Sequence, residues 1–210
     1  MFASDRRPPY ALRRRNLVDA GVGHENCSSR SLIESLPRCA PESEQPMDTS
    51  PLRNAYLILL DAAAAVAQAD PDPIPPAGEW NADQILAHVA IINATTISTA
   101  FAISSGTHTT YDNRVSQDAW TLTHVVEVAG GRDGLYERIR AQGEVLCALV
   151  GPMLSEAELD TLVPTRLVSK DTILVDQPIP LRDIITGLAD VELPGHATQL
   201  RTLLSPTATA

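Results

Sequence analysis

Apolar residues recur at helical spacing through most of this chain, and that periodicity constrains its fold more than any other feature. It predicts helices over residues 51–69, 81–104 and 180–204, and a helical region over 117–150 that breaks or kinks at "AGGRDG". Only 4% of the residues are aromatic, so Leu, Ile, Val and Ala must build the core. Four long helical regions predict an all-α fold, a four-helix bundle, in which metal and cofactor sites lie between facing helices.

Start and stop signals mark the ends of these helices. Ser50 is a predicted N-cap with Pro51 at the first helical position, and the four prolines of "DPDPIPPAGEW" end the first helix. Capping-box pairs begin the second helix and a short later one: Asn81 with Gln84, and Ser155 with Glu158. In "TRLVSKDTILVDQPIP", β-branched residues alternate with polar ones, which predicts a small β-hairpin or extended excursion before the last helix.

The beginning of the chain differs in character from the rest. Residues 1–46 hold seven Arg and six Asp or Glu, with Pro and Ser clusters but no sustained periodicity, which predicts a flexible, disordered N-terminal tail. Residues 47–210 hold nine Lys or Arg and twenty Asp or Glu, and 9 minus 20 gives −11. We therefore expect one folded domain over residues 47–210, with Met47 as a candidate natural start.

Charge and cysteine content argue against several classes of function. A formal net charge of −10 disfavours nucleic-acid binding, because such proteins neutralise phosphates with a basic face. The three cysteines form neither a disulfide framework nor a thiolate zinc pattern, and Cys147 is predicted to be a buried core thiol. Neither a secretory signal nor an apolar run of membrane-spanning length is recognised, so a cytoplasmic protein with no membrane partner is expected.

Two of the five histidines have neighbours that favour metal binding. His88 shares the apolar face of the second helix, so its imidazole is expected to point into the protein; a satisfied core histidine is the alternative. Glu192 and His196 are four residues apart, which places both on one helix face, as in zinc-ligand pairs. The remaining histidines lack ligand-like spacing and are interpreted as solvated or locally hydrogen-bonded: His24, His108 and His124.

Two histidines and one carboxylate would have a definite chemistry if they met in space. They would give a divalent cation three protein ligands and leave a fourth position for water or a substrate atom, the arrangement of catalytic zinc. A structural zinc site closes all four positions, most often with cysteines, and no cysteine is suitably placed. Such a set suits Zn²⁺ and also accepts Ni²⁺ or iron.

The segment "EWNADQILAHVA" resembles the second-helix signature of the DinB-like superfamily, in which a tryptophan precedes the metal histidine by eight residues. Trp80 and His88 fit that pattern, and "HATQL" is similar to the closing segment of the last helix. Most DinB-like proteins have histidine at the position of Glu192; glutamate there is similar to the metal-binding N-terminal domain of mycothiol-dependent maleylpyruvate isomerases. The resemblance covers about residues 50–205 and implies His88, Glu192 and His196 as metal ligands. Trp80 is expected to pack the start of the second helix.

This resemblance implies a metal-dependent transferase or isomerase-like enzyme that activates a low-molecular-weight thiol, such as mycothiol, at the open metal position. The expected partners are that thiol and an electrophilic substrate, and a homodimer is also considered. The isomerases' additional C-terminal domain is not recognised in this sequence, so only the metal platform is implied.

The alternatives are a non-catalytic bundle that binds metal or a small ligand, and a bundle whose site Pro194 has broken, since "ELPGH" replaces an ordinary helical turn. Gln199 is expected to hydrogen-bond near the metal or to support a helix contact.

Overall fold

The protein is mostly helical and carries a small three-stranded sheet. The computed structural model describes residues 46–69, 72–170 and 172–204, so all but the last residue of the tail expected over residues 1–46 lies outside the described part. The α-helices are α1 (Ser50–Ala67), α2 (Ala82–Ser104), α3 (Ala119–Ala129), α4 (Arg132–Ala148), α5 (Glu156–Leu159), α6 (Leu181–Gly187) and α7 (Leu193–Leu203). The 3₁₀ turn is η1 (Arg114–Gln117), and the π-helical turns are η2 (Leu149–Met153) and η3 (Leu188–Glu192). The strands are β1 (Tyr111–Asp112), β2 (Leu162–Ser169) and β3 (Thr172–Pro180).

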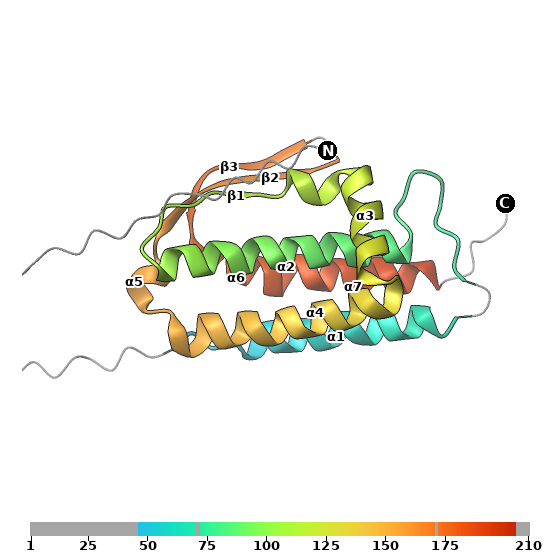
Figure 1. Ribbon diagram of the computed structural model, residues 1–210, viewed down its shortest axis with the longest axis horizontal. Helices are drawn as coiled ribbons and strands as arrows, with labels where there is room; N and C mark the ends of the chain where they lie inside the picture. The colour runs from blue at the N-terminus through green and yellow to red at the C-terminus, as the bar shows by residue number, and fades with distance from the viewer. Residues whose placement is uncertain (1–45, 70–71, 171, 205–210) are drawn as a thin grey trace, which may run out of the picture. The chain divides into compact units, whose positions relative to one another are not determined.

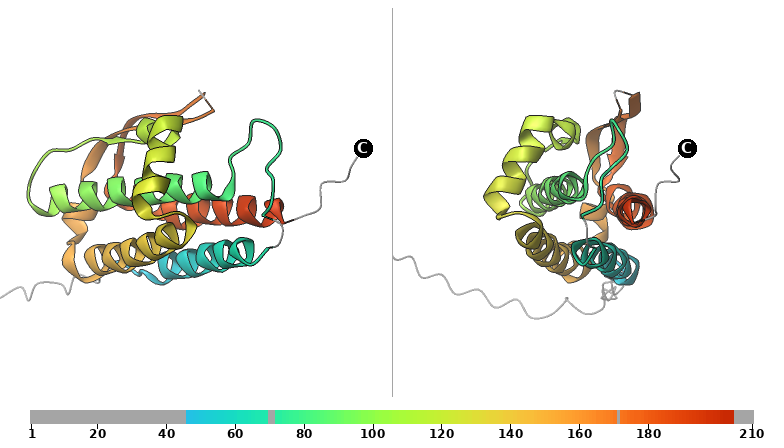
Figure 2. Two further views of the ribbon diagram at one scale, coloured as in Figure 1. Left: turned by 45° about the vertical axis from the view of Figure 1, so that its right-hand side comes forward. Right: turned by 90° about the vertical axis from the view of Figure 1, so that its right-hand side faces the viewer.

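The longest helices run side by side along the long axis of the protein (Figure 1). α1 packs against α4 and α7, and α2 packs mainly against α4 and also touches α7. Viewed end-on, α1, α2, α4 and α7 surround a common interior (Figure 2). Aliphatic side chains fill it, as the low aromatic content requires, and the largest fully buried ones include Leu59, Ile85, Leu86, Leu135, Ile139, Leu146, Leu193 and Leu200.

α2 is enclosed by other elements along its length. It contacts α3, α4, α6 and α7 as well as β1 and η1. Its 23 residues include a stretch of mean hydropathy 1.6, long and apolar enough to cross a membrane, so the expectation that no apolar stretch reaches that length is wrong. Within the protein, 61% of that stretch is buried, and a helix that is apolar on most sides is what the centre of a packed core requires.

The capping predictions hold at two helices and shift at the first. At Asn81 and Ser155 the side-chain oxygen accepts from the backbone N–H three residues on, which completes both capping boxes. Ser50, in contrast, lies inside α1, and Thr49 is the N-cap without a side-chain cap hydrogen bond. Asp48 satisfies the exposed end instead, because its Oδ1 accepts from the backbone N–H of Ser50 at 2.9 Å.

The predicted break at "AGGRDG" separates two helices that point in different directions. α3 lies across the long helices, whereas α4 runs along them (Figure 1). Gly130 and Gly131 both have positive φ, +84° and +83°, a conformation that L side chains rarely adopt. Gly134 then lets the first turn of α4 pass the end of α3, because a Cβ there would lie 1.7 Å from the carbonyl oxygen of Ala129.

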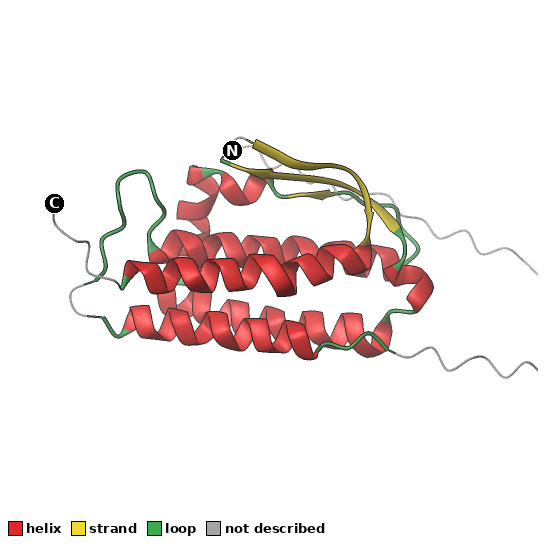
Figure 3. Ribbon diagram, turned by 180° about the vertical axis from the view of Figure 1, so that it is seen from behind, coloured by secondary structure: helices red, strands yellow, loops and turns green. Residues whose placement is uncertain are grey.

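The expected hairpin forms, but it belongs to a sheet, so the all-α prediction is correct only for the helical majority. β2 and β3 pair antiparallel, with Leu162 opposite Pro180 at the open end, three residues before the predicted start. β1 pairs parallel with β2 through Tyr111 and Asp112, between the helices predicted over 81–104 and 117–150. The sheet lies along one side of the helices (Figure 3).

Pro194 distorts the last helical segment, as expected, and the distortion is the π-helical turn η3 just before it. The backbone N–H of Leu193 donates to the carbonyl of Leu188, five residues back. Pro194 has no N–H to donate, and the wider preceding turn accommodates it without ending the helix. Hence α6, η3 and α7 form one continuous helical segment over residues 181–203.

Candidate metal centre

His88, Glu192 and His196 meet in space. Nε2 of His88 lies 2.8 Å from Oε1 of Glu192, and Nε2 of His196 lies 3.2 Å from the same oxygen. The ligand atoms of all three residues lie within 4.8 Å of one another, and the two imidazole centres are 4.7 Å apart. This group could hold a metal ion, and no other such cluster of His, Cys, Asp or Glu occurs within the described ranges.

α2 presents His88 from inside the protein. The neighbouring side chains of Ile85, Leu86 and Val89 are fully buried, and His88 itself is only 3% exposed. A buried imidazole needs polar partners for its nitrogens, because an unpaired buried polar group is costly. Ser116 and Glu192 are those partners, one for each nitrogen.

The π-helical turn η3 decides which face of the last segment carries Glu192 and His196. The buried apolar residues of that segment are Leu181, Ile184, Ile185, Leu188, Ala189, Leu193, Ala197 and Leu200. The backbone hydrogen bond from Leu193 to Leu188 spans five residues instead of the four of an α-helix, because η3 holds one extra residue. In an unbroken α-helix Glu192 and His196 would continue the apolar stripe. The extra residue places them beside it, and Pro194 and Gly195 do not separate them.

Hydrogen bonds outside the cluster orient both imidazoles. Nδ1 of His88 donates to the backbone carbonyl of Ser116 at 2.8 Å, since a carbonyl oxygen can only accept. Nδ1 of His196 lies 3.0 Å from Oε1 of Gln199 and has the same donor role with this placement of the amide. In the neutral rings both Nε2 atoms are then acceptors, and both face the Glu192 carboxylate, a third acceptor. Three converging acceptors require a cation among them, either a proton or a metal ion.

The environment keeps Glu192 ionised. Burial alone would raise the pKa of its carboxyl group, but the hydrogen bonds with His196 and His88, and the electrostatic attraction of these two imidazoles, outweigh burial and hold that pKa well below its usual value. Metal ligands must be deprotonated, so a carboxylate that resists protonation is already in the form a cation needs.

The donor set fits a divalent transition-metal ion. Around tetrahedral zinc, with bonds of about 2.0–2.1 Å, ligand atoms lie roughly 3.3 Å apart. The 3.2 Å contact of His196 matches that spacing, and the 2.8 Å contact of His88 needs a small separation. The three ligand atoms spread over up to 4.8 Å, so they would have to draw closer together around an ion. Both rings direct Nε2 inward while Nδ1 bonds elsewhere, which is the usual arrangement of a metal-bound histidine. Among the residues described, no fourth His, Cys, Asp or Glu joins the group, so an ion would keep a position for an external ligand.

Trp80 borders the cluster. Its ring centre lies 4.9 Å from that of His88 with the planes at 41°, and it packs partly buried against the core, as expected for the start of α2. Beside it, Glu79 pairs with Lys170 of the β2–β3 turn at 2.9 Å. This ion pair connects the hairpin turn with the residues just before α2.

The other candidate residues of the sequence do not join the cluster. His124 stacks on the exposed ring of Trp120 with centres 5.1 Å apart. His108 lines a separate pocket beside the end of α2. Cys147 is buried and only 2% exposed, as predicted for a core thiol. His24 lies outside the described residues.

Two residues that support the cluster were not predicted. Ser116 contributes only a backbone carbonyl, so the identity of its side chain carries no signal for this role. The side chain of Asn113 joins the start of η1 to β2 through Val168. No local sequence pattern predicted that these two segments lie side by side.

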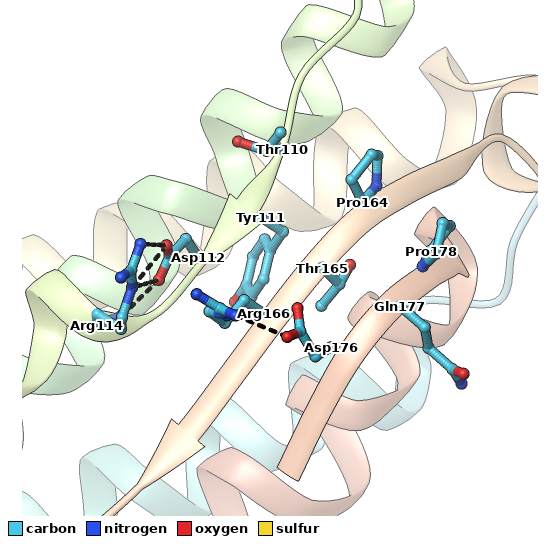
Figure 4. A pocket seen from close by; sticks show the side chains of 10 residues that line it. All are labelled: Thr110, Tyr111, Asp112, Arg114, Pro164, Thr165, Arg166, Asp176, Gln177 and Pro178. Atoms are coloured by element: carbon cyan, nitrogen blue, oxygen red, sulfur yellow. Dashed lines mark hydrogen bonds and ion pairs between the residues drawn. The ribbon is translucent and has the colours of Figure 1, made fainter. Parts of the chain in front are cut away.

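A pocket of about 370 Å³ lies on the sheet rather than at the cluster (Figure 4). Its charged lining consists of two ion pairs, Asp112 with Arg114 and Arg166 with Asp176. None of the three ligand residues lines it. Both arginines of this pocket are already paired with aspartates, so an anionic ligand would have to compete with those ion pairs.

Comparisons with known proteins do not place this chain in a family. No protein-family model matches the chain, and neither a curated protein nor a solved structure matches it. The residues and their geometry therefore carry the assignment of function.

Proposed function

We propose that this protein is a DinB-like four-helix bundle that binds a divalent metal ion through His88, Glu192 and His196, with Zn²⁺ as the first candidate and Ni²⁺ as the second. One observation carries the proposal: two imidazole Nε2 atoms and a carboxylate oxygen converge while both Nδ1 atoms are bonded elsewhere. Converging acceptors of this kind repel one another unless a cation lies among them.

The arrangement of the helices supports the same proposal. α1, α2, α4 and the α6–α7 segment supply four long helices, and the ligands come from two of them, α2 and the last segment. Metal sites in helix bundles are built in this way, from side chains on facing helices. The sheet and the crossing helix α3 are then additions to the bundle.

The activity we propose is transfer of a low-molecular-weight thiol, of the mycothiol class, to an electrophilic carbon. A bound divalent ion lowers the pKa of a coordinated thiol and makes the thiolate available for attack. In the transfer the sulfur forms the new C–S bond, the leaving group departs with its electron pair, and the thiol proton passes to solvent. Glu192 stays ionised and acts as a ligand, so it is not the base that takes this proton. His88 and His196 keep their Nδ1–H groups bonded and their Nε2 atoms directed inward.

A second candidate is a metal-binding bundle without catalysis. The pockets of about 370 and 330 Å³ lie at the sheet and at the end of α2, and neither is lined by a ligand residue. A substrate site next to an ion would have to form from other surfaces. The third reading, a site broken by Pro194, has less support, because His196 and Glu192 remain in contact across that proline.

Metal content tests the proposal directly. Wild type, His88→Ala and His196→Ala are purified as full chains, reconstituted with Zn²⁺, desalted and measured by elemental analysis. About one ion per chain is expected in the wild type and background in both variants, since each removes one of three ligands. His124→Ala, which changes a histidine outside the cluster, should keep the wild-type content. A wild type without metal after reconstitution would remove the proposal.

Turnover separates an enzyme from a binder. Mycothiol and chlorodinitrobenzene are supplied to metal-loaded protein, and formation of the aryl thioether is followed by absorbance. An enzyme forms product in the wild type and in His124→Ala but not in His88→Ala. A metal-loaded wild type that gives only the uncatalysed rate with this and other thiol–electrophile pairs supports the non-catalytic candidate.

A further inference from the structure

We infer that Asn113 is a positioning residue for the metal ligand His88. It touches neither His88 nor another ligand, and it acts through the backbone of Ser116. For its effect on metal affinity the inference depends on the proposed metal centre. Its effect on the His88 ring can be measured in metal-free protein.

Ser116 is held in place by the backbone of Asn113. The Ser116 N–H donates to the carbonyl of Asn113 at 3.1 Å, and the Ser116 hydroxyl donates to the same oxygen at 2.6 Å. Ser116 is fully buried, so neither bond competes with bulk water. The Ser116 carbonyl that accepts from His88 is therefore fixed relative to Asn113.

Asn113 is in turn fixed to β2 by its side chain. Its Oδ1 accepts from the Val168 N–H at 2.8 Å, and its Nδ2 donates to the Val168 carbonyl at 3.0 Å. Strand pairing of β1 with β2 covers Tyr111 and Asp112, and the backbone N–H of Asn113 still donates to the Arg166 carbonyl at 3.3 Å. The side-chain amide of Asn113 extends this contact to Val168, past the end of β1. Val168 lies at the irregularity in the β2–β3 register. Hydrogen bonds from the β1 side therefore hold β2 where its pairing with β3 is interrupted.

The result is one hydrogen-bonded path from the sheet to the ligand. It runs from Val168 through the Asn113 side chain and backbone to the Ser116 carbonyl, and from there to Nδ1–H of His88. An acceptor at Nδ1 fixes which nitrogen carries the proton and how the ring is oriented. Asn113 is 9% exposed and both ends of its amide are bonded to Val168. The side chain of Gln117, at the end of η1, donates to the same Val168 carbonyl, so Asn113 supplies the two-point contact and Gln117 a second contact between η1 and β2.

Two measurements on Asn113→Ala test the inference. Zn²⁺ affinity, measured in competition with a chromophoric chelator at constant pH, is expected to fall about 10–100-fold, the usual effect of losing outer support. In metal-free protein, nitrogen–proton NMR should show a protected Nδ1–H proton on His88 in the wild type. The same signal should be lost or exchange-broadened in Asn113→Ala, because the carbonyl that accepts from it is no longer fixed.

Thr165→Val is the matched control. Thr165 is buried on the same strand, and its hydroxyl donates to the Val163 carbonyl within β2 instead of holding η1. This variant should lower stability while keeping both the affinity and the His88 signal. Asn113→Asp provides a second variant if Asn113→Ala does not fold. It keeps an acceptor for the Val168 N–H but places a second acceptor against the Val168 carbonyl, so losses in the same direction are expected.

Opposite results would overturn the inference. Asn113→Ala or Asn113→Asp with wild-type affinity and an unchanged His88 signal would show that the path does not position the ring. Equal losses in Thr165→Val would assign the effect to the stability of the sheet. A wild type that binds no Zn²⁺ would remove the proposed function alone, because the NMR comparison in metal-free protein would still decide the role of Asn113.

Discussion

Each histidine of the cluster has an acceptor for its Nδ1–H outside the cluster. For His88 this acceptor is the Ser116 carbonyl, and for His196 it is the side chain of Gln199. The sequence left two roles open for this glutamine, and the contact at 3.0 Å supports the one beside the candidate ligand His196. The candidate residues were predictable one by one, because the place of His88 on an apolar helix face and the spacing of Glu192 and His196 are local patterns. That the three residues would meet was implied only by the family resemblance. The outer partner of His88 was not predictable, since Ser116 contributes a backbone atom.

Replacement of Gln199 should weaken metal binding without unfolding the protein. In Gln199→Ala the His196 ring loses its outer acceptor, and Zn²⁺ affinity is expected to fall about 10-fold, at the lower end for such partners because the site is part-exposed. Thr198→Ala is the control: it is exposed, and its hydroxyl bonds only to the Pro194 carbonyl of its own helix. Chelator competition measures both. Equal affinity of Gln199→Ala and wild type would contradict the role given to Gln199.

The lowered pKa of Glu192 predicts how stability depends on pH in metal-free protein. A carboxyl group whose folded pKa lies below its unfolded value of about 4.3 stabilises the native state above that pH. The contribution is lost as the pH falls further toward the folded pKa. Urea denaturation between about pH 6 and pH 3 should therefore show a steeper loss for wild type than for Glu192→Gln, whose side chain does not titrate. Parallel curves would mean that the carboxylate is not stabilised by the histidines.

At the scale of elements, two helical glycines, Gly134 of α4 and Gly187 of α6, differ in the space available for an added Cβ. Gly134→Ala should destabilise the protein by about 1–3 kcal/mol or more, because the added Cβ would overlap the Ala129 carbonyl oxygen, which is backbone and cannot rotate away. Gly187→Ala is the matched control. It is also helical, and a Cβ there meets nothing within 4 Å, so a gain of about 0.5–1 kcal/mol is expected. Denaturant melts of both variants give the comparison, and a stable Gly134→Ala would refute the close approach of α3 and α4.

Helices could be predicted from the sequence far better than the smaller elements. Apolar spacing and capping boxes are local, so α1, α2 and α4 were located to within a few residues. β1 is only two residues long, and its partners, Thr165 and Arg166, lie more than fifty residues further along the chain, which leaves no local pattern. For the last segment, Pro194 predicted a distortion. The form of the distortion, one extra residue in η3, was not predictable. It depends on how Leu188 and Leu193 pack in the core, which is a tertiary property.

For the whole molecule, a metal ion would act as a cross-link between distant parts of the chain. His88 and Glu192 are 104 residues apart, so an ion bound to both stabilises the native state and not the unfolded one. At a free Zn²⁺ concentration about 100 times Kd, the gain is about 2.7 kcal/mol. The melting temperature of wild type should rise with Zn²⁺, whereas that of His196→Ala should not. Calorimetry measures this, and equal shifts in both proteins would place the ion elsewhere.

The continuous helical segment of α6, η3 and α7 has a consequence for the order in which the molecule is completed. It supplies two of the three proposed metal ligands and part of the apolar cover of α2, and the ribosome makes it after every other described helix and strand. Until it docks, His88 has only the Ser116 carbonyl as a polar partner, and no metal group exists. A chain that stalls before Glu192, or whose last segment stays undocked, has one ligand of three. Metal occupancy would thus distinguish finished molecules from unfinished ones.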